Sequence, residues 1–454
     1  MASTSIYRAG DATAGSGYSQ KWTWSGWVKR SGLGTEQGIF SNERTDNHIN
    51  SRFKLRFIAS DVITWECKDS GGSDDSSLVT NAVFRDTSGW CHICFVYDTD
   101  NGTAADRLIL YVNGVRQTFD SENQASSGFG TLWSSSMVHQ IGRYDDNSGN
   151  AKYFKGFMSH IHLSYGYALA PTIFGETDST TGEWKIKTSP SVTYGSQGYF
   201  ILKDGNGLTD QSGEGNDFTL AGGTLSDMQE CPDNIFATFN SLVSMNAQEY
   251  VNCAGSVTTS NSGTSGGYSN LGMNKGKYYA EFKLTDFNTN RCIIGVTSNP
   301  SQDDNDNKYP GQKAWSYSYS AEAGKKYNDN SAVTYGDTYT TNSIIGVALD
   351  LDNLKIYFSK DGVWQDSGDP ESGSTGTGAA YTVTAPASTQ TGFYFFCVGD
   401  ESGSYYVTVK ANFGNGYFGT SAISSEGTTA SNIGKFEFNV PAGYTALSTK
   451  GLNE

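Results

Sequence analysis

Apolar and polar residues alternate in short runs along the whole chain. Residues 108–119 (LILYVNGVRQTF) form two alternating arms around Asn113-Gly114. Both residues of such a two-residue turn take positive φ, so this segment predicts a β-hairpin. Residues 344–364 (IIGVALDLDNLKIYFSKDGVW) alternate in the same way, with turns expected at Asp352-Asn353 and Asp361-Gly362. The pattern predicts an all-β protein of short strands joined by tight turns.

Composition supports this fold class and suggests more than one domain. The chain has 454 residues, with 54 glycines, 8 prolines and 13% aromatic side chains, which is long enough for two or three domains. Residues 229–240 (QECPDNIFATFN) form a plausible junction. We therefore expect one domain over residues 1–235 and a second over 236–454. Residues 171–235 are expected to complete the first domain or to form a short linker module.

The charge pattern excludes some partners. The net charge is −16, and no run of Lys and Arg with interleaved aromatic residues is present, so we expect no nucleic-acid partner. No apolar stretch approaches the roughly 20 residues of a membrane span, so no membrane insertion is expected. The opening residues (MASTSIYRAGDATAG) lack a basic and then apolar signal segment, so we expect the chain not to use that export route.

The cysteines raise the question of redox or metal chemistry. There are seven, including Cys91 and Cys94 in the segment CHICFVYD. An odd number of scattered cysteines is not a disulfide framework, and no second pair is spaced for zinc. On a strand, Cys91 and Cys94 would point to opposite faces. We interpret the segment as a buried strand, and we expect no cofactor.

Two family resemblances follow from longer motifs. The string Trp90-x-His92, followed by Leu-Tyr-Val-Asn-Gly at 110–114, resembles the laminin-G and concanavalin A-like lectin family, as do residues 22–30, 139–144 and 153–169. This resemblance covers residues 1–235. Residues 275–286, 291–298 and 344–364 resemble the SPRY domain, over about residues 240–420. The resemblances imply two tandem antiparallel β-sandwich (jelly-roll) domains, concanavalin A-like and then SPRY-like.

A third resemblance concerns the source of the protein. Residues 171–188, 210–220 and 434–452 resemble stretches of structural proteins of tailed bacteriophages, especially marine ones. This resemblance implies a virion protein that is assembled in the host bacterial cytoplasm. It also implies that other virion proteins are its partners and that the chain is a homo-oligomer in the particle.

The scaffold also resembles the concanavalin A-like glucanases, so an enzymatic role is an alternative to binding. Those enzymes place paired carboxylates on one strand face, and retaining hydrolysis needs two carboxyl groups about 5–5.5 Å apart. The nearest match here is Glu176-x-Asp178, but Thr180 and Thr181 stand where a third carboxylate belongs. We expect that the chain is not an enzyme.

Two loop clusters are the candidate binding sites. Sugar recognition favours an aromatic ring for the apolar face of the sugar, with Asp or Asn for its hydroxyl groups. The candidates in the first domain are Trp133, Tyr144, Asp145, Asp146 and Asn147. In lectin-like relatives acidic loops also hold calcium, so the resemblance implies a possible calcium site at Asp145 and Asp146. The candidates in the second domain are Asp303, Asp304, Asp306, Trp315, Tyr317 and Tyr319.

Two functions remain open at this point. In the first, the chain is a virion surface protein, in a tail fibre, head fibre or appendage, that binds host-surface glycan through the loops of its lectin-like sandwich. In the second, it is a structural or decoration protein of the capsid or tail that binds other virion proteins. An exposed pocket that combines aromatic and acidic residues would favour the first function, and a large apolar patch would favour the second.

Overall fold

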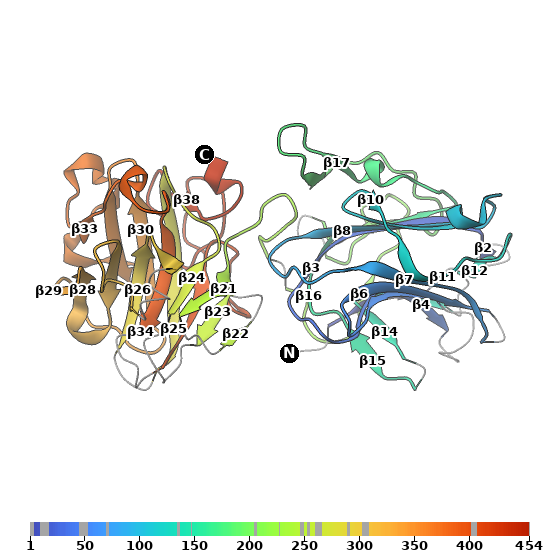
Figure 1. Ribbon diagram of the computed structural model, residues 1–454, viewed down its shortest axis with the longest axis horizontal. Helices are drawn as coiled ribbons and strands as arrows, with labels where there is room; N and C mark the ends of the chain where they lie inside the picture. The colour runs from blue at the N-terminus through green and yellow to red at the C-terminus, as the bar shows by residue number, and fades with distance from the viewer. Residues whose placement is uncertain are drawn as a thin grey trace. The chain divides into compact units, whose positions relative to one another are not determined.

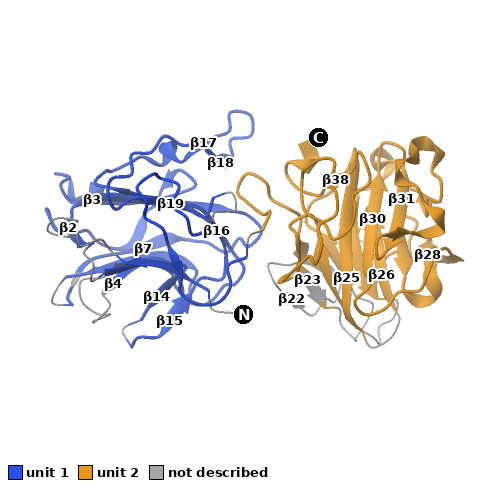
Figure 2. Cartoon of the chain, turned by 180° about the vertical axis from the view of Figure 1, so that it is seen from behind, with its two compact units in different colours: residues 1–227 blue, residues 228–454 orange. Residues whose placement is uncertain are grey.

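The chain folds into two compact units, residues 1–227 and 228–454, and strands joined by turns and short 3-10 helices build each of them (Figures 1 and 2). The computed structural model describes residues 4–9, 18–44, 53–69, 72–133, 137–146, 148–203, 207–226, 228–245, 249–251, 255–258, 266–287, 291–301, 308–400 and 406–453. Within these residues, no helix is long and apolar enough to cross a membrane. The all-β class that was predicted is confirmed.

Unit 1 contains an antiparallel sheet of eight strands in the order β11-β7-β6-β5-β4-β13-β1-β20. The strands are β1 (Ile6–Ala9), β4 (Gln37–Arg44), β5 (Phe53–Phe57), β6 (Val62–Lys68), β7 (Asp74–Val83), β11 (Phe119–Asn123), β13 (Met137–Ile141) and β20 (Thr219–Leu220). A second sheet of six strands, in the order β10-β9-β8-β3-β16-β19, faces it (Figure 1). The strands of the second sheet are β3 (Lys21–Arg30), β8 (Cys91–Asp98), β9 (Leu108–Val112), β10 (Val115–Arg116), β16 (Gly156–Tyr165) and β19 (Tyr199–Ile201).

Small elements close the ends and the outer face of unit 1. They are β2 (Tyr18–Ser19) paired with β12 (Thr131–Leu132), β14 (Arg143–Asp145) with β15 (Ala151–Tyr153), β17 (Gly175–Thr177) with β18 (Trp184–Ile186), and the 3-10 turns η1 (Ala104–Asp106) and η2 (Pro171–Ile173). Strand β19 pairs with β16 and β20 pairs with β1. Both main sheets therefore contain a strand from the region after residue 171.

Alternate residues of the strands in unit 1 point between the sheets, and many of these residues are aromatic. Trp22 of β3 stacks on Phe53 at 5.2 Å and on Tyr97 at 5.2 Å. Space here is tight, since a Cβ atom on Gly26 would lie 2.5 Å from the side chain of Ile161. The predicted hairpin is confirmed: β9 and β10 are joined by Asn113 and Gly114, with φ of 48° and 75°.

Unit 2 contains a sheet of seven strands in the order β21-β24-β34-β26-β27-β28-β29. They are β21 (Phe239–Met245), β24 (Gly266–Ser269), β26 (Cys292–Thr297), β27 (Ser316–Ser320), β28 (Lys325–Asn328), β29 (Ser331–Thr334) and β34 (Phe395–Asp400). The facing sheet has nine strands: β22 (Glu249–Val251), β23 (Ser256–Thr258), β25 (Lys277–Phe287), β30 (Ile344–Asp350), β31 (Lys355–Lys360), β32 (Val363–Trp364), β33 (Tyr381–Thr382), β35 (Val407–Asn412) and β38 (Thr445–Ala446). The remaining elements are β36 (Tyr417–Phe418), β37 (Ser421–Ala422), η3 (Glu322–Gly324), η4 (Gln365–Ser367), η5 (Pro370–Thr375), η6 (Pro386–Ser388) and η7 (Gly451–Asn453).

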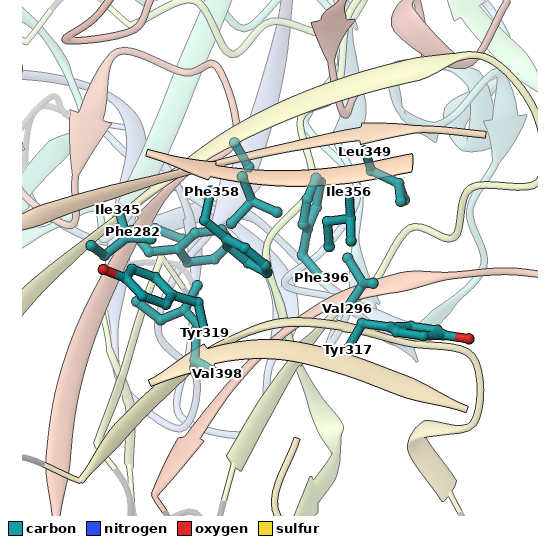
Figure 3. Close-up of a cluster of buried hydrophobic side chains, with 14 of the residues drawn as sticks. Phe282, Val296, Tyr317, Tyr319, Ile345, Leu349, Ile356, Phe358, Phe396 and Val398 are labelled. Carbon is teal, nitrogen blue, oxygen red and sulfur yellow. The ribbon is translucent and has the colours of Figure 1, made fainter. Parts of the chain in front are cut away.

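The alternation predicted over residues 344–364 is found in unit 2. Leu349, Ile356 and Phe358 are completely buried in the core between the two sheets (Figure 3). Val347 belongs to the same core and is also completely buried. The turn between β31 and β32 is made by Asp361 and Gly362, with φ of 49° and 81°.

Candidate functional site

The two aromatic rings of the loop cluster predicted in unit 1 lie inside the protein. Trp133 and Tyr144 are completely buried, and Trp133 packs 5.5 Å from Trp22 in the core. The Tyr144 hydroxyl donates to Glu36 at 2.6 Å. The expectation that these two rings face a ligand is therefore wrong. The sequence could not show it, because their burial depends on strands that are distant in the chain.

The acidic residues of this loop are engaged by the protein itself. Both carboxylate oxygens of Asp145 accept hydrogen bonds from the Arg143 guanidinium, at 2.7 and 2.8 Å. Asp146 accepts hydrogen bonds from the backbone N–H groups of Ser148 and Asn150. These bonds, together with the interaction with Lys152, lower the pKa of Asp146 to about 2. Asn147 lies outside the described residues. Among the residues that the structure describes, no group of three or more His, Cys, Asp or Glu side chains forms a metal site.

The cluster predicted in unit 2 is divided by the structure. Tyr317 and Tyr319 of β27 point into the core rather than to a ligand (Figure 3), and they are 5% and 0% exposed. The Tyr319 hydroxyl donates to the backbone oxygen of Asp337. Trp315 precedes the strand and is half-buried, with the Lys313 ammonium 5.5 Å from its ring. Asp303, Asp304 and Asp306 lie outside the described residues.

The Cys-x-x-Cys segment forms the buried strand that its alternation predicts. Cys91 packs against the core between the sheets, whereas Cys94 belongs to a cluster with Val96 and Phe174 on the other face of β8. Both thiols are free. Burial raises the pKa of Cys91 to about 12, so the reactive thiolate is scarce at neutral pH.

His92, inside that segment, approaches a serine in a way that resembles a nucleophile and its base. Its Nε2 lies 2.8 Å from Ser25 Oγ, and its Nδ1 lies 3.1 Å from Trp184 Nε1. An indole N–H can only donate, so Nδ1 is the acceptor and Nε2 carries the proton of the neutral ring. His92 therefore donates to Ser25 and cannot take its proton. Burial also lowers the pKa of His92 to about 3.

The carboxylate pair considered for hydrolysis lies on the β17–β18 hairpin. Asp178 accepts the backbone N–H groups of Thr180 and Thr181, and Lys185 approaches Glu176 at 3.5 Å and Asp178 at 3.2 Å. Glu176 is exposed, and both carboxylates share one ammonium group. This arrangement is that of a surface ion-pair cluster.

A pocket of about 230 Å³ opens at one end of unit 1, where β3, β5, β7 and β9 end and β8 begins. We call it the sheet-end pocket. Its apolar lining comes from both sheets and from the β7–β8 connection: Val28, Phe57, Val83, Phe84, Trp90 and Val112. Its polar lining includes Arg30, Arg85, Asp86 and Asn113.

A buried ion cluster forms one wall of the sheet-end pocket. Asp61 accepts from Arg30 Nη2 at 2.9 Å, from Arg85 Nε at 3.1 Å and from the backbone N–H of Gly34 at 2.9 Å. Burial alone would raise the pKa of Asp61, but these bonds lower it. Arg30 is almost completely buried, lies 4.1 Å from the Phe57 ring centroid and donates to the Phe84 carbonyl at 2.7 Å. The cluster orients both guanidinium groups.

Four polar atoms on three residues at the pocket have no partner within the described residues. Arg30 Nε is buried and unpaired. The Nη atoms of Arg85 make no hydrogen bond, although its Nε is fixed on Asp61. Asp86 Oδ1 accepts from the N–H groups of Ser88 and Gly89, which leaves Oδ2 open. The pocket thus combines apolar walls with oriented donors and an acceptor.

Sequence reasoning did not find this site. Several lining residues belong to quoted motifs, such as Arg30 in residues 22–30, Trp90 in the Trp90-x-His92 string and Asn113 in the hairpin turn, but those motifs predicted strands and a turn, not a binding site. Arg30, Asp61 and Arg85 come from three separate segments, and no local spacing brings them together. The available signal was weak: of these three residues, only Arg30 ends a segment that had been identified as a strand, residues 22–30.

Comparisons with known proteins agree with this architecture. A family described as the concanavalin A-like lectin/glucanases superfamily matches residues 7–173, and the SPRY domain family matches residues 277–415. Among curated proteins, the dual specificity protein kinase splA of Dictyostelium discoideum is 29% identical over 86 residues. That stretch is 19% of this chain and only 3% of the kinase.

Solved structures resemble parts of the chain. The SPRY domain of human HERC1 is 20% identical with a TM-score of 0.30, covering 38% of this chain and 96% of that one. A putative carbohydrate binding protein from Bacteroides ovatus is 15% identical with a TM-score of 0.32, covering 50% and 61%. A SAP-like pentraxin from Limulus polyphemus is 15% identical with a TM-score of 0.28, covering 37% and 72%. Likeness at these TM-scores says nothing of a shared function. From the two family matches, the chain contains a concanavalin A-like lectin/glucanase domain followed by a SPRY domain.

Proposed function

We propose that this chain is a non-enzymatic glycan-binding protein and that the sheet-end pocket of unit 1 holds the sugar. The observation that carries the proposal is the pairing of apolar walls with unpaired polar atoms in the lectin-like unit. Phe84 and Val83 offer apolar surface to the face of a sugar ring. Arg85 and Asp86 offer a donor and an acceptor for its hydroxyl groups.

The size of the pocket supports recognition of one sugar residue. Pockets that enclose drug-sized ligands measure about 300–1,000 Å³, and this one measures about 230 Å³. A single ring at the end of a glycan is of suitable size for it, with the rest of the chain in solvent. Recognition of a terminal residue also suits an open end of a sandwich, where loops converge.

The proposal includes a place of action, the surface of a bacteriophage particle. Support comes from the resemblance of residues 171–188, 210–220 and 434–452 to structural proteins of tailed phages. A tail fibre, head fibre or appendage would present unit 1 to host-surface glycan, and the chain would be held in place by other virion proteins. The alternative is a decoration protein whose two sandwiches contact only other virion proteins.

The proposal is tested by binding of the purified full-length chain to host cells and to an array of bacterial surface glycans, with calcium and with chelator. Saturable binding that free sugar competes away is the expected result. Val83→Glu places a charge at the pocket lining, where Val83 is 47% exposed, and is expected to weaken binding at least tenfold. The matched control is Val115→Glu, 64% exposed on β10 and outside the lining, which should bind as the wild type does.

Three results would overturn parts of the proposal. Binding by Val83→Glu equal to wild type would place the sugar elsewhere. Binding to purified particles without sugar competition, and none to glycans, would establish the decoration function instead. New reducing ends released from a bound glycan would show that the chain is an enzyme.

A further inference from the structure

The lining of the sheet-end pocket includes two arginines, although the molecule as a whole is acidic. The chain has a net charge of −16. Around the pocket, Arg30 and Arg85 share the single carboxylate of Asp61. Burial would raise the pKa of Asp86, but the Ser88 hydroxyl, the N–H groups of Ser88 and Gly89 and the charge of Lys29 together lower it. Arg30 and Arg85 are the cations of the lining, and Asp86 is its carboxylate.

Arg85 is the cation of the lining that a ligand can reach. Its side chain is 64% exposed, and its Nε is held by Asp61 at 3.1 Å. The two Nη atoms make no hydrogen bond within the described part of the chain, so the planar fork is oriented and both of its N–H edges remain available as donors. A guanidinium fork matches a carboxylate with two parallel N–H···O bonds, and such charge-assisted pairs are roughly twice as strong as neutral ones.

From this geometry we infer that the sheet-end pocket selects a sugar residue bearing a carboxylate, as in a uronic acid, with its carboxylate on the Arg85 fork. The inference rests on the proposed function, because it names the class of sugar that the same pocket takes. Asp86 Oδ2, the acceptor left open, takes a ring hydroxyl group. The apolar side chains of Val83 and Phe84 cover one face of the ring.

A comparison of two matched ligands tests this inference by calorimetry on the full-length chain. One is an oligosaccharide that ends in glucuronic acid, and the other is the same oligosaccharide after reduction of its carboxyl group to give glucose. The acid is expected to bind at least tenfold more tightly at low salt, and the difference should shrink as ionic strength rises. Equal affinity for the two would overturn the inference while leaving the proposed function intact.

Variants of Arg85 assign the preference to its fork. Arg85→Gln is expected to bind the acidic and the neutral sugar with equal affinity, because the group that distinguishes them is gone. Arg85→Lys keeps the charge without the fork and should restore only part of the preference. The control is Arg116→Gln, an exposed arginine paired with Asp106 in the same unit, which should behave as the wild type does. An Arg85→Gln chain that still prefers the acid would contradict the assignment.

The remaining outcomes are also decisive. If neither sugar binds and no glycan on the array binds, both the proposed function and this inference fail. If a peptide rich in Asp and Glu binds more tightly than the acidic sugar, and Arg85→Gln abolishes that binding, the fork recognises a protein carboxylate and the inference is wrong.

Discussion

At the scale of single residues, Asp61 holds the wall of the sheet-end pocket together. Its carboxylate is almost completely buried and accepts from two arginines and a backbone N–H group. Its backbone has φ of 64°, a conformation that asparagine also tolerates. Removing one partner of a buried ion pair leaves the other charge uncompensated, at a cost of about 3–5 kcal/mol.

Asp61→Asn is therefore expected to lower the free energy of unfolding of unit 1 by about 3 kcal/mol at pH 7. The native pKa of Asp61 lies below its ordinary 3.8. The stability it contributes is thus fully present above that value and is lost as pH falls toward the native pKa. Urea unfolding at pH 7 and at pH 3 measures both effects. The control Asp106→Asn breaks an exposed pair and should change stability by no more than about 1 kcal/mol.

At the scale of elements, the segment after β35 covers the outer face of the nine-stranded sheet in unit 2. Phe436, Val440 and Tyr444 pack with Tyr279 and Tyr357 in one buried cluster. Glu281 of β25 joins this segment to the sheet by accepting the backbone N–H groups of Glu437 at 2.8 Å and Phe438 at 2.9 Å. The burial that this contact requires raises the pKa of Glu281 to about 7 and outweighs the hydrogen bonds that lower it.

The stability of unit 2 is expected to fall as pH rises from about 4.5 to about 7. In that window the unfolded chain has lost the Glu281 proton, whereas the folded chain still holds it, so rising pH favours unfolding. The slope is at most about 1.4 kcal/mol per pH unit for one group. Glu281→Gln removes the titrating group and should flatten the slope, as followed by denaturant unfolding between pH 5 and 8. Glu322→Gln, in an exposed pair with Arg291, should keep the wild-type slope.

At the scale of the whole molecule, the two units carry different titrating groups. All five histidines lie at or before position 162, so unit 2 contains none. His92, His139 and His162 are buried, and burial lowers the pKa of each below the ordinary 6.5. His139 is completely enclosed, 4.8 Å from the Trp133 ring. These rings stay neutral in the folded unit, whereas the unfolded chain takes up protons below about pH 6.5.

Acid is therefore expected to move the two thermal transitions of the chain in opposite directions. Between pH 7 and pH 5, unit 1 loses stability because its unfolded histidines bind protons, and unit 2 gains stability because folded Glu281 keeps its proton. Scanning calorimetry resolves the transitions, and Glu281→Gln identifies the one that belongs to unit 2. Parallel shifts of both transitions would contradict the assignment.

Much of the fold follows from the sequence because its determinants are local. The alternation of apolar and polar residues predicted the strands that the structure shows as β9, β30 and β31. It also predicted that Cys91 and Cys94 lie on opposite faces of one strand, as they do. Asn113-Gly114 and Asp361-Gly362 predicted their turns because few residues tolerate positive φ. These preferences act between neighbours in the chain, so they can be seen without the tertiary structure.

Only the tertiary structure decided which polar and aromatic side chains are buried, and therefore where a ligand can bind. Trp133 and Tyr144 are aromatic residues of the kind that sugar sites use, but strands distant in sequence enclose them. Arg30, Asp61 and Arg85 are unremarkable in the sequence, yet the ends of β3, β5 and β7 bring them into one cluster. Desolvation and charge pairing depend on neighbours in space, and packing of the two sheets supplies those neighbours.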